Sequence, residues 1–329
     1  MARLNVTSTL FNKANKPTDG LGVSVTLEEL IALRFEASHL TLANQRKLMS
    51  VMAGGYQSRF RGRGIDFAET RHYQPGDDVR SIDWRVTART GHPHTKVYQE
   101  ERERPVFLVV DYGPNMVFGT RVAFKSVVAA RTAALLGWAA ANHNDRVGGV
   151  IMLPQHCRDI RPAGGRRGVL KLLKSLADDL PTTFDISPSS DYLNRGLMQV
   201  RRVAHPGSLV CILSDFQSMD ENSERHLKQL AQHTDVLAIF LYDALEYELP
   251  PPNQYTISDG KKTLRIDTGD TVFREQYHSY FEQRYDGLKT LFKQQGLHLL
   301  PVATHDSVAA TLKRGLSRNA TPLELSQRN

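Results

Sequence analysis

Two aspartates stand directly after runs of apolar residues and are the side chains of this sequence best placed to do chemistry. Asp111 follows the run PVFLVV, and Asp215 follows the run SLVCILS. Such runs, rich in β-branched and aliphatic residues, predict strands that are buried on both faces of a parallel sheet. Ligand sites of these sheets lie beyond the carboxyl ends of the strands. The two carboxylates are therefore expected at one edge, where they either serve a site or cap helices and satisfy loop amides.

The elements that must position these aspartates alternate between strands and helices. The runs RVGGVIML, DVLAIFLYD and LHLLPVAT predict further buried strands, and a hairpin is expected around Asp259-Gly260. Helices are predicted from Arg121 to about Asn142 and, the longest, over residues 271–295. Such alternation predicts an α/β fold over residues 105–318, with a mostly parallel sheet and helices on both faces. Residues 319–329 are a polar tail.

The N-terminal part of the chain is expected to contain a helix and a β-rich segment. Residues 1–25 have the composition of a flexible lead-in. Thr26, with Glu29 three residues later, forms a capping-box pattern, so an amphipathic helix is predicted from Leu27 to about Met49. Short strands and turns follow it, and together they give a segment over residues 26–104.

The stretch RHYQPGDDVRSIDWRVTAR, from Arg71 to Arg89, crowds charged residues around a tryptophan. In one interpretation it is a structural brace, in which arginines pair with aspartates across a Pro-Gly turn and Trp84 sits in an apolar seat. In another it is a docking surface, because Arg and aromatic side chains are enriched at binding hot spots. Catalysis is disfavoured, since no nucleophile, base and orienting group recur at a recognised spacing. The residues involved are Arg71, Tyr73, Pro75, Gly76, Asp77, Asp78, Arg80, Asp83 and Trp84.

The strand-end aspartates give the sequence a resemblance to von Willebrand factor A domains. In that fold an Asp-x-Ser-x-Ser motif follows the first strand, and a later threonine and an aspartate after the fourth strand complete a magnesium site. Here Gly113 and Asn115 replace the serines, and the threonine position falls on Asp191. The resemblance implies a degenerate site for Mg²⁺ or Mn²⁺ that also forms the recognition surface. Its candidate oxygen ligands are Asp111, Asn115, Asp191 and Asp215.

The charged stretch and its surroundings closely resemble the domain of unknown function 58 family. The shared signature is Gly-x-Gly, an acidic residue with Phe, Arg-x-Tyr, Pro-Gly-Asp-Asp-x-Arg and Ile-Asp-Trp, all present between Gly62 and Trp84. With the A-like domain, the resemblance runs from about Arg59 to the final strand. It implies association with a MoxR-type AAA+ ATPase and a chaperone-like role in maturing or remodelling an unknown client protein. Many relatives carry two membrane helices near the N-terminus, which this sequence does not show.

Composition limits the kind of protein and the cellular compartment that this sequence can be assigned to. The chain has 329 residues, a formal charge of +7 and two cysteines, so neither a disulfide framework nor a zinc spacing is present. With no targeting signal and no apolar stretch of membrane-spanning length, a cytoplasmic protein is expected.

The glycine-rich stretches GGYQSRFRGRG and RPAGGRRG lack a phosphate-loop ending, so no nucleotide is expected. Asp243 and Glu246 also follow a strand, but the Pro-rich segment after them favours an ordered loop outside the site.

The expected function is therefore that of a non-enzymatic, protein-binding adaptor or scaffold. Two alternatives of other classes stay open. The first is a metal-dependent hydrolase that uses the strand-end aspartates. The second is a nucleic-acid-binding protein that contacts phosphates through RFRGRG and RDIRPAGGRRG, although acidic residues nearly balance the basic ones around the first of these stretches.

Overall fold

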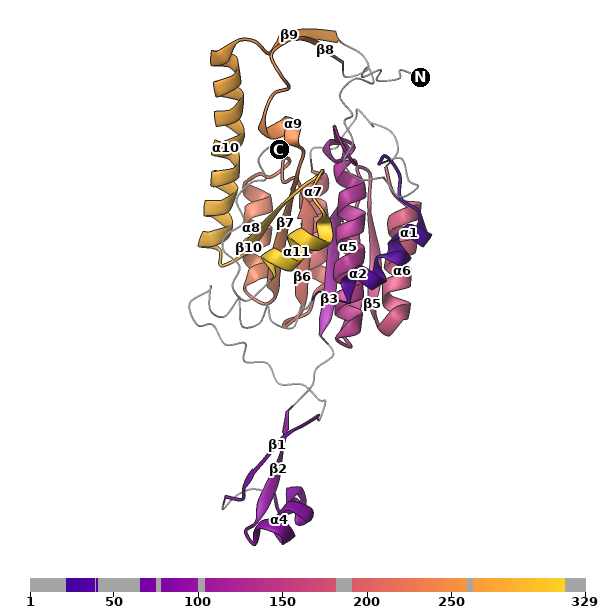
Figure 1. Ribbon diagram of the computed structural model, residues 1–329, viewed down its shortest axis with the longest axis vertical. Helices are drawn as coiled ribbons and strands as arrows, with labels where there is room; N and C mark the ends of the chain where they lie inside the picture. The colour runs from indigo at the N-terminus through magenta and orange to yellow at the C-terminus, as the bar shows by residue number, and fades with distance from the viewer. Residues whose placement is uncertain are drawn as a thin grey trace. The chain divides into compact units, whose positions relative to one another are not determined.

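Figure 1 shows the computed structural model of the chain, which describes residues 22–38, 40, 66–74, 78–99, 104–181, 191–258 and 263–316. The chain divides into two compact units. One unit combines Met1–Gln57 with Pro105–Asn329, and the other is Ser58–Arg104. They are described separately here as the sheet unit and the signature unit.

The sheet unit is built on six strands whose order confirms the predicted fold class. The order is β10-β7-β6-β3-β4-β5, with β5 antiparallel to β4 and every other neighbouring pair parallel. The chain order reverses between β3 and β6, which makes their carboxyl ends a topological switch point of the kind where ligands bind. The strands are β3 (Pro105–Asp111), β4 (Arg146–Met152), β5 (Cys157–Gly164), β6 (Leu209–Ser214), β7 (Asp235–Tyr242) and β10 (His298–Ala303).

Helices cover both faces of this sheet, as Figure 1 shows. Alternate residues of β3 point to opposite faces, so Leu108 belongs to one buried core and Phe107 to the other. One core lies under α1 (Leu27–Ala32), α2 (Arg34–Ala37), α5 (Lys125–Asn142), α6 (Gly165–Asp178) and α11 (Val308–Gly315). The other lies under α7 (Tyr192–Val203), α8 (Glu221–Ala231) and α10 (Thr271–Gln294).

The N-terminal helix differs from its prediction in two respects. It breaks at Leu33 into α1 and α2, and residues 41–65, which include the rest of the predicted helix, lie outside the described ones. It also packs in the sheet unit instead of sharing a segment with the signature stretch. Trp138 of α5 donates to the Leu30 carbonyl at 3.1 Å. Glu29, half of the expected capping box, instead pairs with Arg131 at 2.6 Å.

The inserted hairpin and the long helix after it are present in the sheet unit. Strands β8 (Gln254–Ser258) and β9 (Thr263–Asp267) pair antiparallel, and the four residues between them, with the predicted Asp259-Gly260 turn, lie outside the described ones. The short α9 (Ala244–Tyr247) precedes β8. Within the described residues, no helix combines the length and apolar character needed to cross a membrane.

The signature unit is small. Strands β1 (Asp66–His72) and β2 (His94–Gln99) form an antiparallel pair, joined through a 3-10 turn, η1 (Val79–Ser81), and α4 (Trp84–Thr90). None of its apolar side chains whose burial the structure describes is buried. A two-stranded hairpin is only marginally stable by itself.

Candidate functional site at the carboxyl edge of the sheet

The two strand-end aspartates lie together, as the sequence predicted. Asp111 is the last residue of β3, and Asp215 directly follows β6, which pairs with β3 in parallel. Both are buried, and burial, followed by the negative charge of Asp215, raises the pKa of Asp111. Two carboxylates side by side in a core need compensating donors or a cation.

A lysine supplies that cation. Lys125 is the first residue of α5, and its Nζ lies 2.7 Å from Asp215 Oδ2 and 2.8 Å from Glu246 Oε1. Lys125 is fully buried, which is rare for a lysine without paired carboxylates. Burial lowers the pKa of this ammonium, but the charges of Asp215 and Glu246 outweigh that effect and raise it above the ordinary 10.5. The side chain is therefore positively charged at neutral pH.

Asp111 has a different environment from Asp215. Its Oδ1 accepts from the Gly113 amide at 2.7 Å, and its Oδ2 accepts from Ser214 Oγ at 2.5 Å. Burial, followed by the charge of Asp215, raises the pKa of Asp111 from 3.8 to about 7, against the smaller lowering effects of these hydrogen bonds and of Lys125. Near neutral pH this carboxyl group is therefore divided between its protonated and its ionised form.

The backbone after β6 is strained at this edge. Phe216 has a φ of 51°, in the left-handed region that aromatic residues rarely occupy. Its amide donates to Ser214 Oγ at 2.9 Å, the same hydroxyl that donates to Asp111. Its ring packs edge-on against Phe292 of α10 at 5.2 Å between centroids. Such strain costs about 1–3 kcal/mol. The hydrogen bond from the Phe216 amide leaves the Ser214 hydroxyl proton to be donated to Asp111.

Asp243 and Glu246, which sequence reasoning left outside the site, belong to this edge. Asp243 follows β7, is fully buried, and accepts from Thr120 Oγ1 at 2.5 Å and from the Thr120 amide at 3.0 Å. Glu246 accepts from the Asp243 amide through one oxygen and from Lys125 through the other. Asp243 ends a buried strand just as Asp111 and Asp215 do, so the same signal identifies it.

The other two predicted ligands have different places. Asn115 is half-buried in the 3-10 turn η2 (Pro114–Met116). Asp191 precedes α7, and its Oδ1 accepts from Asn194 Nδ2 at 2.9 Å. The same amide nitrogen donates to Asp220 at the start of α8, and Ser223 Oγ donates to Asn194 Oδ1 at 2.6 Å. The Asp191 carboxylate thus contributes to a cluster that joins α7 to α8.

Tyr192, the residue after Asp191, packs beside the carboxyl end of β3, where Asp191 itself was expected. The Tyr192 hydroxyl accepts from Ser218 Oγ at 3.2 Å, and burial, followed by the charge of Asp111, raises the pKa of this phenol. Its ring fills the space beside Gly113, where an added Cβ would lie 2.4 Å from the ring. Glycine at 113 is therefore required by the tyrosine, and no serine of the A-domain pattern fits there.

Replacing Gly113 with alanine is expected to destabilise the protein by about 1–3 kcal/mol, because the new methyl group overlaps the ring of Tyr192. Urea unfolding followed by circular dichroism measures the change. The matched control is Gly287→Ala on α10, where an added Cβ meets nothing within 4 Å and the helix gains propensity. A Gly113→Ala protein as stable as the wild type would contradict the packing described for Tyr192.

These side chains do not fit a divalent metal ion. Hard cations need oxygen ligands that are free to coordinate. Here both oxygens of Asp111 accept hydrogen bonds, and those of Asp215 accept from Lys125 and from the Gln217 amide. The described residues include no group of three or more His, Cys, Asp or Glu arranged to hold a metal.

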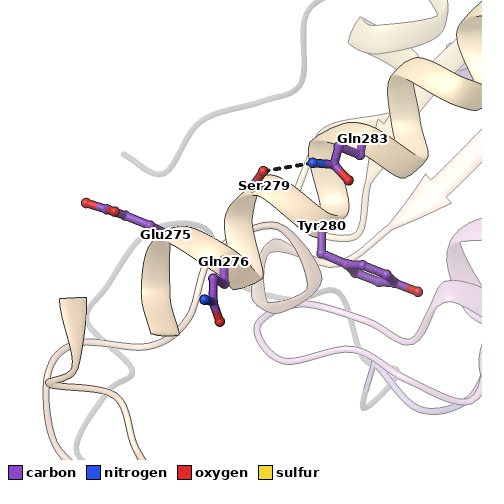
Figure 2. A pocket seen from close by; sticks show the side chains of 5 residues that line it. All are labelled: Glu275, Gln276, Ser279, Tyr280 and Gln283. Atoms are coloured by element: carbon purple, nitrogen blue, oxygen red, sulfur yellow. Dashed lines mark hydrogen bonds between the residues drawn. The ribbon is translucent and has the colours of Figure 1, made fainter. Parts of the chain in front are cut away.

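A surface pocket on α10 offers no alternative chemistry. Figure 2 shows that all its lining side chains come from this one helix, with Ser279 and Gln283 joined by a 3.2 Å hydrogen bond. The lining residues are Glu275, Gln276, Ser279, Tyr280 and Gln283. They bring together no pair of a nucleophile and a base, so this pocket does not support catalysis.

Two aspartates of the signature accept hydrogen bonds from nearby backbone amides. Asp78 Oδ1 accepts from the Arg80 amide at 2.9 Å, and Asp83 Oδ1 caps α4 by accepting from the amides of Arg85 and Val86. Trp84 was expected in an apolar seat under the brace interpretation, but it is 69% exposed. Helix α4 has no buried residue that could provide such a seat. Arg71 Nη1 donates to the His72 carbonyl at 3.2 Å, and Tyr73 is half-buried, whereas Pro75, Gly76 and Asp77 lie outside the described residues.

The fold and the site together define a class of protein. It has a doubly wound α/β domain whose strand edge is closed by a buried lysine–carboxylate centre, and a separate signature unit. The model of the family described as protein of unknown function DUF58 matches residues 69–285. The chain belongs to this family, as the signature predicted.

Similar proteins include one relative from Mycobacterium tuberculosis and several solved structures. The relative, an uncharacterized protein, is 31% identical over 241 residues, which is 72% of this chain and 74% of the relative. BatB from Bacteroides thetaiotaomicron is similar with a TM-score of 0.41 and 10% identity, over 65% of this chain and 97% of that one. A von Willebrand factor type A protein from Catenulispora acidiphila is similar with a TM-score of 0.37 and 12% identity, over 68% and 43% of the two chains.

Proposed function

We propose that this protein is a non-enzymatic adaptor that binds a MoxR-type AAA+ ATPase through its signature unit and presents a client protein for maturation or remodelling. The observation that carries the proposal is the exposed tryptophan of the signature unit. Trp84 is 69% exposed and Val79 is 59% exposed, on two adjacent short helices of the unit. An exposed tryptophan with apolar neighbours is typical of a binding hot spot.

Charge supports an acidic surface on the partner. Arg80, Arg85 and Arg89 lie in η1 and α4, close in sequence to Trp84, and all three are exposed. None of them forms an ion pair with another described residue. Guanidinium groups next to an aromatic anchor favour bidentate contacts with carboxylates. The ATPase surface that binds this unit should therefore present Asp or Glu side chains around an apolar seat.

The strand edge supports the non-enzymatic part of the proposal. The carboxyl groups of Asp111 and Asp215 are buried and already occupied by hydrogen bonds and by Lys125. A metal-dependent hydrolase needs an open coordination position and access for its substrate, and this edge offers neither. For the same reason we move the recognition surface, which the sequence favoured at this edge, to the signature unit.

Replacing Trp84 with alanine is expected to weaken binding to the purified MoxR-type ATPase of the same organism by at least about thirty-fold, because the hot-spot side chain is removed. Biolayer interferometry with ATP present measures the dissociation constant. The matched control is Tyr280→Ala, which removes an aromatic side chain of similar exposure, 72%, from α10 of the sheet unit. Unchanged affinity of the Trp84→Ala protein would overturn this docking surface.

Fluorescence distinguishes a surface that is free for a partner from one covered by the rest of the chain. The chain has two tryptophans, so Trp138→Phe leaves Trp84 as the single reporter. We expect its emission to be quenched by acrylamide in the free protein and protected when the ATPase is added. Protection in the free protein would show that another part of the chain covers Trp84, and would contradict the proposal.

A further inference from the structure

Lys125 places an ammonium group among the carboxylates of the strand edge. Its Nζ lies 2.7 Å from Asp215 and 2.8 Å from Glu246. Asp215 follows the fourth strand of the sheet in chain order, the position of the metal-site aspartate in the A domains that the sequence resembles. We propose that the ammonium group of Lys125 takes the place of a divalent ion, so that this edge is a closed, metal-independent ion-pair centre.

The position of Lys125 is fixed by more than its ion pairs. Its backbone amide donates to the Phe118 carbonyl at 2.8 Å, and its Nζ lies 5.8 Å from the centre of the Phe118 ring. Because the residue begins α5, its side chain starts from a rigid element that packs on β3. Folding of the chain therefore places the cation at the edge, and no ion from solution is needed to bring the carboxylates together.

The carboxylates bound by Lys125 come from two different segments. Asp215 follows β6, and Glu246 lies in α9, after β7. The Asp215 carbonyl also accepts from Arg284 of α10. Lysine thus links the start of α5 to the ends of two neighbouring strands, as a metal ion with ligands from several loops would do. A divalent ion at the same place would have to displace the ammonium group or sit against its charge.

The centre is closed to an acidic ligand from a partner. The side chains of Lys125 and Asp215 are each 1% exposed, and that of Glu246 is 16% exposed. Gln217 Nε2 donates to Glu246 Oε1 at 3.2 Å from the exposed side of the cluster. A carboxylate on a partner therefore has no open coordination position to complete, in contrast to recognition through a metal.

Manganese titration tests this inference, which does not depend on the identity of any partner. For the wild-type protein, the electron paramagnetic resonance signal of free Mn²⁺ should stay undiminished, and the melting temperature should be the same with Mg²⁺, Mn²⁺ or EDTA. Stoichiometric Mn²⁺ binding accompanied by a higher melting temperature would overturn the proposal.

Lys125→Ala removes the cation and leaves the carboxylates of Asp215 and Glu246 facing the space that the ammonium group filled, so we expect a divalent ion to take its place. We expect this variant to bind one Mn²⁺ ion and to melt at least about 3 °C higher with Mn²⁺ than with EDTA. Lys289→Ala, which removes an exposed lysine on α10, is the matched control and should bind none. A folded Lys125→Ala protein that binds no Mn²⁺ would also overturn the proposal that Lys125 takes the place of a metal ion. If this variant does not fold, the wild-type titration decides alone.

Discussion

Lys125→Met is expected to lower the free energy of unfolding by about 3–5 kcal/mol, because it removes one partner of a buried ion pair and leaves the other charged group uncompensated. Methionine fills nearly the same volume as lysine, so the loss reports charge more than packing. Asp215 is buried and would lose the cation 2.7 Å away, while Glu246 would lose the one 2.8 Å away. Urea unfolding monitored by circular dichroism measures the change as a shift in the midpoint.

Two controls separate the effect of the buried pair from that of any lost lysine or arginine. Arg225→Met breaks an exposed pair with Glu221 on α8, in which the side chains are 68% and 88% exposed, and should cost at most about 0.5 kcal/mol. The double variant Lys125→Met with Asp215→Asn removes both charges of the shorter contact. It should lose less stability than the sum of the two single variants. A Lys125→Met protein with an unchanged midpoint would show that the ion pair does not hold the edge together.

Raising the pH from 4 to 8 is expected to destabilise the fold through Asp111. Burial and the charge of Asp215 raise the pKa of this group from 3.8 to about 7, so between these values the folded state holds a proton that the unfolded state has released. Stability then falls as pH rises, and the loss is complete once the pH exceeds the folded pKa. A difference of about three pKa units corresponds to about 4 kcal/mol.

Asp111→Asn isolates this contribution, because asparagine keeps the shape and cannot ionise. The stability of the Asp111→Asn protein relative to wild type should rise between pH 4 and 7 and then level off. The altered hydrogen bond with Ser214 lowers this relative stability by a constant amount at every pH. Asp220→Asn is the matched control, since the hydrogen bonds from the Ser223 amide and from Asn194 lower the pKa of Asp220. Its relative stability should fall as pH rises through the acidic range. A stability difference between Asp111→Asn and wild type that does not vary with pH would contradict the raised pKa.

Local signals in the sequence were sufficient for the five parallel strands of the sheet and for part of the site. Buried strands such as PVFLVV need only their own apolar run to be recognised, and the turn residues around them bound the helices. The aspartates at 111 and 215 could be placed at one edge because parallel strands bring their carboxyl ends together. Asp243 carries the same signal after β7 and could have been included on the same reasoning.

The break in the N-terminal helix and the exposure of Trp84 could not be predicted from local signals. Thr26 does cap α1, accepting from the Glu29 amide at 3.2 Å, but the helix breaks at Leu33 without a proline or glycine to announce it. Trp84 follows an N-cap aspartate, which predicts the start of α4 but says nothing about what covers its side chain. Exposure depends on the elements that pack nearby, and α4 has none to bury this ring among the described residues.

The sequence by itself determined the five parallel strands of the sheet, the family signature and the meeting of Asp111 with Asp215. Only the tertiary structure decided what neutralises Asp215. Lys125 is 90 residues from Asp215 and 121 from Glu246 in the chain, and no local pattern relates positions so far apart. From the sequence alone, a lysine at the start of an apolar helix is expected to extend into solvent. It becomes the buried cation of the strand edge because α5 packs across β3 and its first residue meets the ends of β6 and β7, where burial makes an unpaired charge too costly to leave.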